Sequence, residues 1–449
     1  MTTITNNEHK KLNFSSEREQ SQACLNSAEH EKNQGRKVLN VPNKQEQNQT
    51  CLDSAEREGL RPKGNVPNLR FPEFQGEWEK KSLGEIGDSF IGLTYRPTDV
   101  VSEGGLIVFR SSNIQNGCMD YKDIVRVNKN VKEKLITKKD DLLVCARNGS
   151  ARLIGKNAIL HEADANQTFG AFMMVFRSDK NHFVHQLLNT RRYSSQVSEN
   201  LGARINQITS SDLSSFEFFF PTENSEMNKI AALLDLLDER IATQNKVIED
   251  LKKLKCAIIE TVYNGKGHEY RIGDIIDQVS QRNKRCLVNT VLSVNNKLGF
   301  INQDEQFEDR TVASEDTSNY KVVFKDDFAY NPARINVGSI ARLKSFDKGI
   351  VSPMYICFKV TDGIVPEYLE SYFATNHFFK EMQKRLEGSV RLCLSFEGLC
   401  NIPIFVPCID EQTEIGKRIY QLEYKIETEC NILSLYEKQK QYLLRQMFI

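Results

Sequence analysis

A long apolar repeat occurs twice in this chain of 449 residues, about 185 positions apart. In both copies the apolar residues recur at the three- and four-residue spacing of an amphipathic helix. The first copy consists of Ile230, Leu234, Leu237, Ile241, Ile248, Leu251, Ile258 and Val262, which fall on Ile415, Ile419, Leu422, Ile426, Leu433, Tyr436, Leu443 and Met447. The polar interruptions match too, because Gln244 falls on Glu429 and Lys255 on Lys440. This repetition predicts two equivalent halves within one polypeptide.

The first helix is predicted from about Ser225 to Tyr263, since Asn264 and Gly265 are typical of a helix C-terminus. The second is predicted from about Glu411 to the end of the chain. A helix of about forty residues is about 60 Å long, and its apolar stripe needs a partner. We expect the two helices to pair antiparallel, with one globular domain at each end of a rod; a parallel pair would need a different chain path. Apolar residues off the seam, which we expect to face water, are Leu233, Leu236, Ile259, Leu435 and Leu444.

Outside the helices the sequence has mixed character. Short β-type runs at 106–109, 142–145 and 172–176 alternate with turns that contain Gly and Asn. The second half restarts at 270–276, which echoes 82–86. We therefore predict an α+β protein with a pseudo-two-fold internal repeat: two globular mixed α/β domains separated by two long antiparallel coiled-coil helices. The predicted segments are a disordered N-terminal extension (1–68), a first domain (69–221), a first helix (222–268), a second domain (269–407) and a second helix (408–449).

Composition limits the function classes. Lys and Arg number 60 and so do Asp and Glu, so any surface for nucleic acid must arise from local segregation of charge. No window approaches the ~18 apolar residues of a membrane span, and the N-terminus has no apolar signal core. The eleven cysteines form no C-x-x-C pair, which favours reduced thiols. We expect a cytoplasmic protein that binds no metal and does not contact a membrane.

Motifs for catalysis are weak. There is no G-x-x-x-x-G-K-[ST] loop for a nucleotide. Asn331-Pro332 faintly resembles the Asn-Pro-Pro-aromatic loop of amino-methyltransferases, but the second proline and the aromatic residue are missing. Asp140-Asp141 and Asp326-Asp327 precede apolar runs at equivalent places in the two halves, which favours turns over a metal-binding nuclease site. We therefore predict no catalytic residues.

Polar and basic loops recur at corresponding places in the two domains. Arg, Asn, Gln and Ser are the side chains whose donors and acceptors match base edges and phosphates. The alternative interpretation is a set of solvated surface turns. The candidates in the first domain are Arg110, Ser112, Asn113, Arg147, Asn148, Arg152, Arg204 and Gln207. The candidates in the second domain are Ser293, Asn295, Asn296, Lys297, Arg334, Asn336, Arg342, Lys344 and Arg391.

Three segments resemble one known family. The entry segment 69–84 is similar to the start of a type I restriction-modification DNA specificity subunit. Segments 327–340 and 349–355 are similar to stretches of that family's target-recognition domains. A proline, an acidic cap and a long helix, occurring twice, resemble its two spacer helices. The resemblance covers about residues 69–449, and the N-terminal extension departs from it.

The resemblance implies a division of labour. Each mixed domain would read one part of a split, asymmetric sequence in double-stranded DNA, and the helices would set the distance between the parts. Two methyltransferase subunits, and with them a restriction subunit, would dock on the chain and direct adenine methylation or restriction. The specificity subunit would have no catalytic residues and no cofactor, with S-adenosylmethionine, ATP and Mg expected in the partner subunits.

Two other classes remain open from the residues alone. One is a free-standing DNA-binding relative, which co-purification with a methyltransferase would exclude. The other is a coiled-coil scaffold whose globular ends bind proteins. Loss of duplex binding after mutation of the Arg/Asn loops would argue against a scaffold.

Overall fold

The computed structural model describes residues 64–203, 206–263, 267–296, 298–303, 316–389 and 391–449. Within this part the chain forms two compact units, each of which holds one mixed domain and a portion of both long helices. The first unit comprises residues 64–249 and 427–449, and the second comprises 250–426. The predicted 1–68 extension lies outside the described residues up to position 63.

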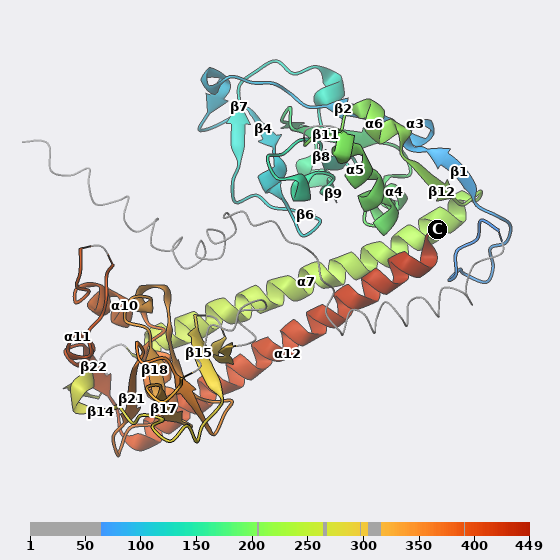
Figure 1. Ribbon diagram of the computed structural model, residues 1–449. Coiled ribbons are helices and arrows are strands. Elements are labelled where there is room, and N and C mark those ends of the chain that lie inside the picture. Colours follow the sequence, from blue (N-terminus) through green and yellow to red (C-terminus); the bar gives the residue numbers. More distant parts are fainter. Residues whose placement is uncertain (1–63, 204–205, 264–266, 297, 304–315, 390) are drawn as a thin grey trace, which may run out of the picture. The chain divides into compact units, whose positions relative to one another are not determined.

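The first unit is built on an antiparallel sheet in the order β2-β11-β8-β9, with a second sheet, β10-β4-β7-β3, and a two-stranded ribbon, β1-β12. Helices α4, α5 and α6 pack against β8 and β11 and close the main core (Figure 1). The strands are β1 (Glu79–Ser82), β2 (Asp88–Ile91), β3 (Val100–Val101), β4 (Leu106–Phe109), β5 (Ile114–Gln115), β6 (Cys118–Met119), β7 (Val125–Val127), β8 (Leu142–Cys145), β9 (Asn157–Ile159), β10 (Thr168–Phe169), β11 (Met173–Arg177) and β12 (Glu217–Phe220). The helices of this domain are α3 (Leu83–Ile86), α4 (Asn181–Leu187), α5 (Arg191–Ala203) and α6 (Ser210–Ser215).

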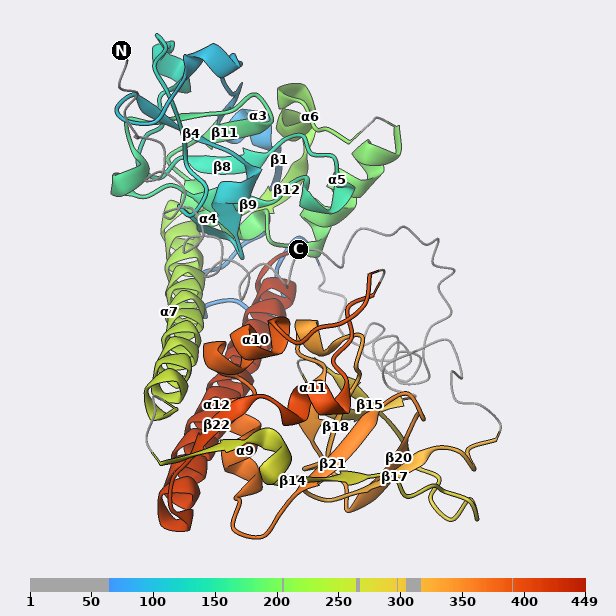
Figure 2. The ribbon, with the colours of Figure 1, turned by 90° about the vertical axis from the view of Figure 1, so that its left-hand side faces the viewer.

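The second unit repeats this plan. Its sheet β14-β21-β18-β19 has the same antiparallel order, and the ribbon β13-β22 corresponds to β1-β12. Figure 2 shows α9, α10 and α11 close to the sheet that contains β18 and β21, and their apolar side chains share its core. The strands are β13 (His268–Arg271), β14 (Ile276–Val279), β15 (Val291–Asn295), β16 (Gly299–Asn302), β17 (Lys321–Phe324), β18 (Phe328–Tyr330), β19 (Ile340–Arg342), β20 (Lys348–Val351), β21 (Ile356–Val360) and β22 (Pro403–Val406). The helices are α9 (Pro366–Tyr372), α10 (Asn376–Gln383) and α11 (Phe396–Cys400).

The two long helices confirm the apolar repeat that the sequence contains twice. Helix α7 (Asn224–Val262) and helix α12 (Ile409–Met447) each contain 39 residues. In the first unit Asp238 pairs with Lys440 and Gln244 with Glu429. Residue numbers thus increase along α7 in the direction in which they decrease along α12. The helices therefore pair antiparallel. The polar interruptions of the apolar pattern are the residues that make these interhelix contacts.

The seam is buried as predicted where the helices meet a domain core. Ile230 and Leu234 of α7 are buried in the main core of the first unit. Leu233, Leu236 and Leu435 are exposed, as expected for positions off the seam. The same prediction is wrong for Ile259 and Leu444, which are buried. Leu444 packs in the first core beside Met447 and Phe448, so the end of α12 uses more than one face.

Both Asp-Asp pairs form turns, which confirms that prediction. Asp140 and Asp326 have positive φ, 63° and 71° respectively, a conformation that Asp tolerates better than most residues. The next residues, Asp141 and Asp327, are buried, and each accepts a hydrogen bond of 2.8 Å from the backbone N–H three residues earlier. The carboxylates therefore close a turn before β8 and β18.

The start of α7 contains a buried ion pair. Arg70 donates from Nε and Nη2 to Glu226 at 2.7 and 2.8 Å, and the Glu226 side chain is almost completely buried. Trp78, the only tryptophan, donates to the same carboxylate at 3.3 Å. Asn65 O accepts from the Trp78 backbone and Pro67 is buried, so packed structure begins before the predicted boundary at residue 69.

Three features bear on the function classes that were considered. No helix in the described residues is long and apolar enough to cross a membrane. Among those residues no group of three or more His, Cys, Asp or Glu is arranged to hold a metal ion. The nine cysteines in this part are free thiols, and burial raises the pKa of Cys145 to about 11 and that of Cys357 to about 12.

Candidate nucleic-acid interface

Three predicted loops of the first domain meet at one surface. The backbones of Arg147 and Gln207 pair in an antiparallel bridge. Asn206 Nδ2 donates to Gly149 O at 3.2 Å, which joins the same two loops a second time. Asn148 Nδ2 donates to Ser111 Oγ at 3.1 Å and links the loop after β8 to the loop after β4. Segments far apart in the sequence therefore present one polar surface.

The exposed groups of this surface have the right chemistry for nucleic acid. Arg147 and Arg152 are exposed, whereas Asn148, Gln207 and Ser112 are half-buried. The Arg147 guanidinium lies 5.4 Å from the centre of the Phe172 ring, which leaves its edge free to donate. Two cations beside amide groups can bind phosphate or a guanine edge.

Asn113 has a different role from the predicted one. It is 1% exposed, and its Nδ2 donates to Asp120 O and Asp123 O at 2.9 and 3.0 Å. Its Oδ1 accepts from the Arg110 backbone at 2.9 Å. Asn113 therefore holds the loop and cannot present its amide to DNA, which corrects the prediction. The Arg110 guanidinium pairs with Asp123 at 2.6 Å and stays half-buried.

The second domain brings another set of loops together. Asn295 and Asn296 form the turn after β15, where the Leu298 N–H donates to Asn295 Oδ1 at 3.1 Å. The segment that contains Arg334 and Asn336 lies beside this turn, because Ser339 Oγ donates to Val294 O at 3.3 Å. Asn296 and Arg334 are exposed, and Asn336 is half-buried.

Arg391 belongs to the same region. Its hairpin is closed by paired hydrogen bonds between Glu387 and Cys393, and the next residue, Leu394, donates from its backbone N to Pro332 O at 3.1 Å. The exposed Arg391 is thus on a loop that is hydrogen-bonded to Pro332, two residues before Arg334. The predicted contacts at Arg204 and Lys297 lie outside the described residues.

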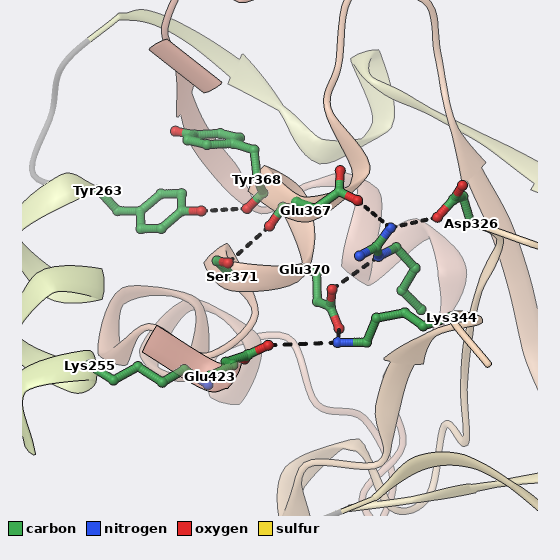
Figure 3. Close-up of polar contacts among 10 residues, drawn as sticks. Lys255, Tyr263, Asp326, Lys344, Glu367, Tyr368, Glu370, Ser371 and Glu423 are labelled. Atoms are coloured by element: carbon green, nitrogen blue, oxygen red, sulfur yellow. Dashed lines mark hydrogen bonds and ion pairs between the residues drawn. The ribbon is translucent and has the colours of Figure 1, made fainter. Parts of the chain in front are cut away.

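Three candidates of the second domain are placed elsewhere. Ser293 is on β15 and is 7% exposed, so it belongs to the sheet interior. Arg342 is also 7% exposed, and it contacts the carboxylates of Asp326, Glu367 and Glu370 at 2.5, 2.6 and 3.0 Å (Figure 3). Lys344 is exposed but pairs with Glu370 at 2.8 Å. The predicted base or phosphate contacts of Ser293 and Arg342 are therefore corrected to structural roles.

The electrostatics of Arg342 support this assignment. Burial lowers the pKa of Arg342, but the carboxylates of Glu370, Glu367 and Asp326 outweigh burial and raise the pKa above its ordinary value. The Arg342 guanidinium binds three carboxylates through Nε and Nη1, and its burial leaves little of it accessible to a phosphate. The sequence-based assignment failed because a basic residue in a loop pattern does not reveal the acids that fold against it.

Sequence reasoning missed two apolar residues at these surfaces. Phe172 directly precedes β11 and is 59% exposed, and Met354 lies just before β21 and is 61% exposed. The Arg147 backbone donates to Phe172 O at 3.0 Å, and Asn331 Nδ2 lies 3.9 Å from Met354 Sδ. The two residues thus occupy corresponding places beside the polar loops. The available signal was an apolar residue one or two positions before an equivalent strand in each half.

Comparison with known proteins finds similar sequences and a matching family model. Residues 75–253 match the family described as "Type I restriction modification DNA specificity domain". The chain is 24% identical over 383 residues to the Type I restriction enzyme EcoKI specificity subunit of Escherichia coli (strain K12), covering 77% of this chain and 82% of that protein. It is 26% identical over 201 residues to the Type I restriction enzyme StySPI specificity subunit of Salmonella potsdam, covering 42% and 43% of the two chains.

A solved structure shares the fold. The crystal structure of a Type-I restriction-modification system S subunit from M. genitalium superposes with a TM-score of 0.54 at 18% identity. The match covers 86% of this chain and 99% of that chain. The α+β architecture with two mixed domains and two long helices is therefore the fold of that structure, as the sequence predicted.

Proposed function

The chain belongs to the DNA specificity subunits of type I restriction-modification systems, which are themselves non-catalytic, and on this basis we propose that it reads a bipartite, asymmetric site in double-stranded DNA. In this proposal residues 69–221 and 269–407 are the two target-recognition domains, and the long helices are the spacers between them. Each domain reads one half of the site, and partner subunits methylate adenine or cleave the DNA.

The repeated polar surface supports this proposal most directly. In each domain exposed arginines, with asparagines that are half-buried in the first domain, lie beside an exposed apolar side chain, Phe172 or Met354, close to the start of equivalent strands. Donors for base edges next to an apolar group that can meet a thymine methyl are the elements of direct readout. The loops differ in sequence, as two readers of unlike half-sites require.

The proposed partners follow from the family and the exposed helix faces. Two methyltransferase subunits and a restriction subunit assemble on the chain in the cytoplasm. S-adenosylmethionine, ATP and Mg belong to those partners. Leu236 and Leu435, which are 61% and 63% exposed on α7 and α12, are apolar positions that a partner helix can cover.

Exchange of one domain tests the proposed function. Replacing residues 77–220 with the same region of a relative should change one half of the target and leave the other half unaltered. The measurement is the map of methylated adenines in cells that carry the exchanged chain with its partner subunits. Exchange of residues 269–407 is the reciprocal control. A change in both halves after a single exchange would contradict independent reading.

Single arginine variants test the proposed surfaces. Arg147→Ala or Arg334→Ala should weaken specific binding by ~1–3 kcal/mol and relax the preference at one base pair if the side chain contacts a guanine edge. If it contacts phosphate, binding to all sequences should weaken together and the salt slope should flatten. Arg192→Ala is a matched control, because its guanidinium lies over the Phe219 ring beside β12. Binding and salt slope both unchanged in the two variants would identify these loops as solvated turns.

A further inference from the structure

One interhelix ion pair occurs twice, at equivalent positions of the repeat. In the first unit Lys440 of α12 donates to Asp238 of α7. In the second unit Lys255 of α7 donates to Glu423 of α12. A shift of 185 positions carries Asp238 onto Glu423 and Lys255 onto Lys440. Each helix therefore contributes one acid and one lysine to the same contact.

Each acid also contacts its neighbouring domain. In the first unit Gln186 of α4 donates from Nε2 to Asp238 at 3.0 Å and to Asp235 at 2.9 Å. Gln186 is completely buried, so packing holds its side chain against the two acids. Asp238 is thus held by a lysine from the opposite helix and by an amide from the recognition domain.

The second unit has the same arrangement with different side chains. Glu423 lies between Lys255 of α7 and Lys344, whose Nζ is 3.9 Å from Glu423 and 2.8 Å from Glu370 of α9 (Figure 3). Tyr263 adds a second link, because its hydroxyl donates to Tyr368 O on α9. Helix α9 follows β21 as α4 follows β11, so the equivalent helix is reached in both units, directly through Gln186 in the first and through Lys344 in the second.

Apolar contacts attach the domains, whereas the acids constrain direction. Ile230 and Leu234 of α7 share the first core with α4, and Tyr263 and Ile415 pack on the second core. Apolar packing is non-directional and tolerates small rotations. A charge-assisted hydrogen bond, such as the one from Gln186 to Asp238, weakens steeply when its geometry changes, and an ion pair, such as the one between Lys344 and Glu423, weakens as its distance grows. The acid that joins three elements therefore resists rotation of the domain on its helices.

We infer that Asp238 and Glu423 are positioning residues that fix the angle of each recognition domain on the helix pair and thereby the gap between the two half-sites. This inference rests on the proposed bipartite reading of DNA. Neither residue touches DNA in this scheme. Their effect is on which gap length the complex accepts, and the bases read in each half do not depend on them.

Charge-neutral variants in the full chain, assembled with its partner subunits, test the inference. Asp238→Asn and Glu423→Gln keep the shape and remove the charge. We expect both half-site sequences to persist in the methylation map, while the preference for one gap over gaps one base pair longer or shorter falls by about tenfold. Glu414→Gln is the matched control, because Glu414 pairs with Arg418 within α12, and it should keep the single gap.

Exchanging the charges of each ion pair tests whether the contact with the recognition domain matters, or only the contact between the helices. Asp238→Lys with Lys440→Glu restores an opposite pair, and the Gln186 amide can accept as well as donate, so the single gap should return. Glu423→Lys with Lys255→Glu also restores the interhelix pair but places a lysine against Lys344. This second exchange should leave the gap relaxed. Recovery in both cases would show that the helices alone are involved and would overturn the inference.

Two further outcomes are decisive. Binding of the purified complex to duplexes with different gaps should show a redistribution among gap lengths. Equal loss on all gaps, or an unchanged single gap in Asp238→Asn and Glu423→Gln, would overturn the positioning role. A wild-type chain that yields no bipartite motif would instead refute the proposed function.

Discussion

Replacing Arg70 with methionine should lower the free energy of unfolding of the first unit by about 3–5 kcal/mol, the usual cost of removing one partner of a buried ion pair. Glu226 is 1% exposed and would keep only the Trp78 indole N–H and the N-terminus of α7 as compensation. The hydrogen bond to Glu226 raises the pKa of Arg70 above its ordinary value. Urea unfolding followed by the fluorescence of Trp78 measures the effect directly, because this is the only tryptophan.

Two variants control for lost packing. Arg70→Met combined with Glu226→Gln removes the stranded charge and should recover part of the loss. Lys229→Met disrupts the exposed pair with Glu73 nearby and should change the free energy of unfolding far less than Arg70→Met does. A loss below about 1 kcal/mol for Arg70→Met would mean that water reaches Glu226.

Acidification should destabilise the first unit through His185. Burial, aided by the charge of Lys440, lowers the pKa of His185 to about 4, and Nδ1 is 2.8 Å from Asn157 Oδ1. In the unfolded chain His185 is protonated below about pH 6.5, whereas in the folded protein it stays neutral down to about pH 4. The contribution of His185 to the free energy of unfolding is therefore fully present above pH 6.5 and decreases as pH falls towards 4. The loss reaches about 3 kcal/mol at ~1.4 kcal/mol per pH unit. Asp235 and Asp238 also face this histidine and oppose the shift.

The neighbouring His182 should act in the opposite direction. Its hydrogen bond with Asp235 raises the pKa of His182, so its stabilising contribution is complete below pH 6.5 and is lost as pH rises through the raised value. Unfolding measured from pH 4 to 9 should therefore show greatest stability near neutrality. His185→Gln should flatten the acid side, and His182→Gln the alkaline side. An unchanged acid slope in His185→Gln would assign that slope to other groups.

The fold was predictable wherever the sequence pattern was periodic. Apolar spacing along α7 and α12 is independent of tertiary contacts, so both helices were placed within about two residues of their observed bounds. Strands β4 and β8 coincide with the predicted runs, because continuous apolar segments between turns have few alternatives. The predicted exposure of Ile259 and Leu444 was wrong. For Leu444 the reason is that heptad spacing describes one helix pair and ignores the domain core that packs on a second face.

The surface was less predictable because residue type does not report partners. Arg147 and Arg342 look alike in sequence, but one is exposed and the other is enclosed by three carboxylates. Asn113 has a base-reading side chain and uses it on its own loop. Phe172 was predicted as part of a strand, but it is the residue before β11 and its side chain is exposed. Such distinctions depend on which distant segments fold together.

The contact between Gln244 and Glu429 has a genetic consequence. Each of these residues is the repeat equivalent of the other, so in a homodimer of half-length chains one codon would specify both sides of the contact. Two glutamates there would bring like charges together, which is unfavourable. A pair of different residues, such as Gln244 and Glu429, requires a gene that has one codon for each side of the contact. When one gene encodes both halves, a mutation can change one side of a contact and leave the other side unchanged. The recognition loops of the two domains can diverge for the same reason.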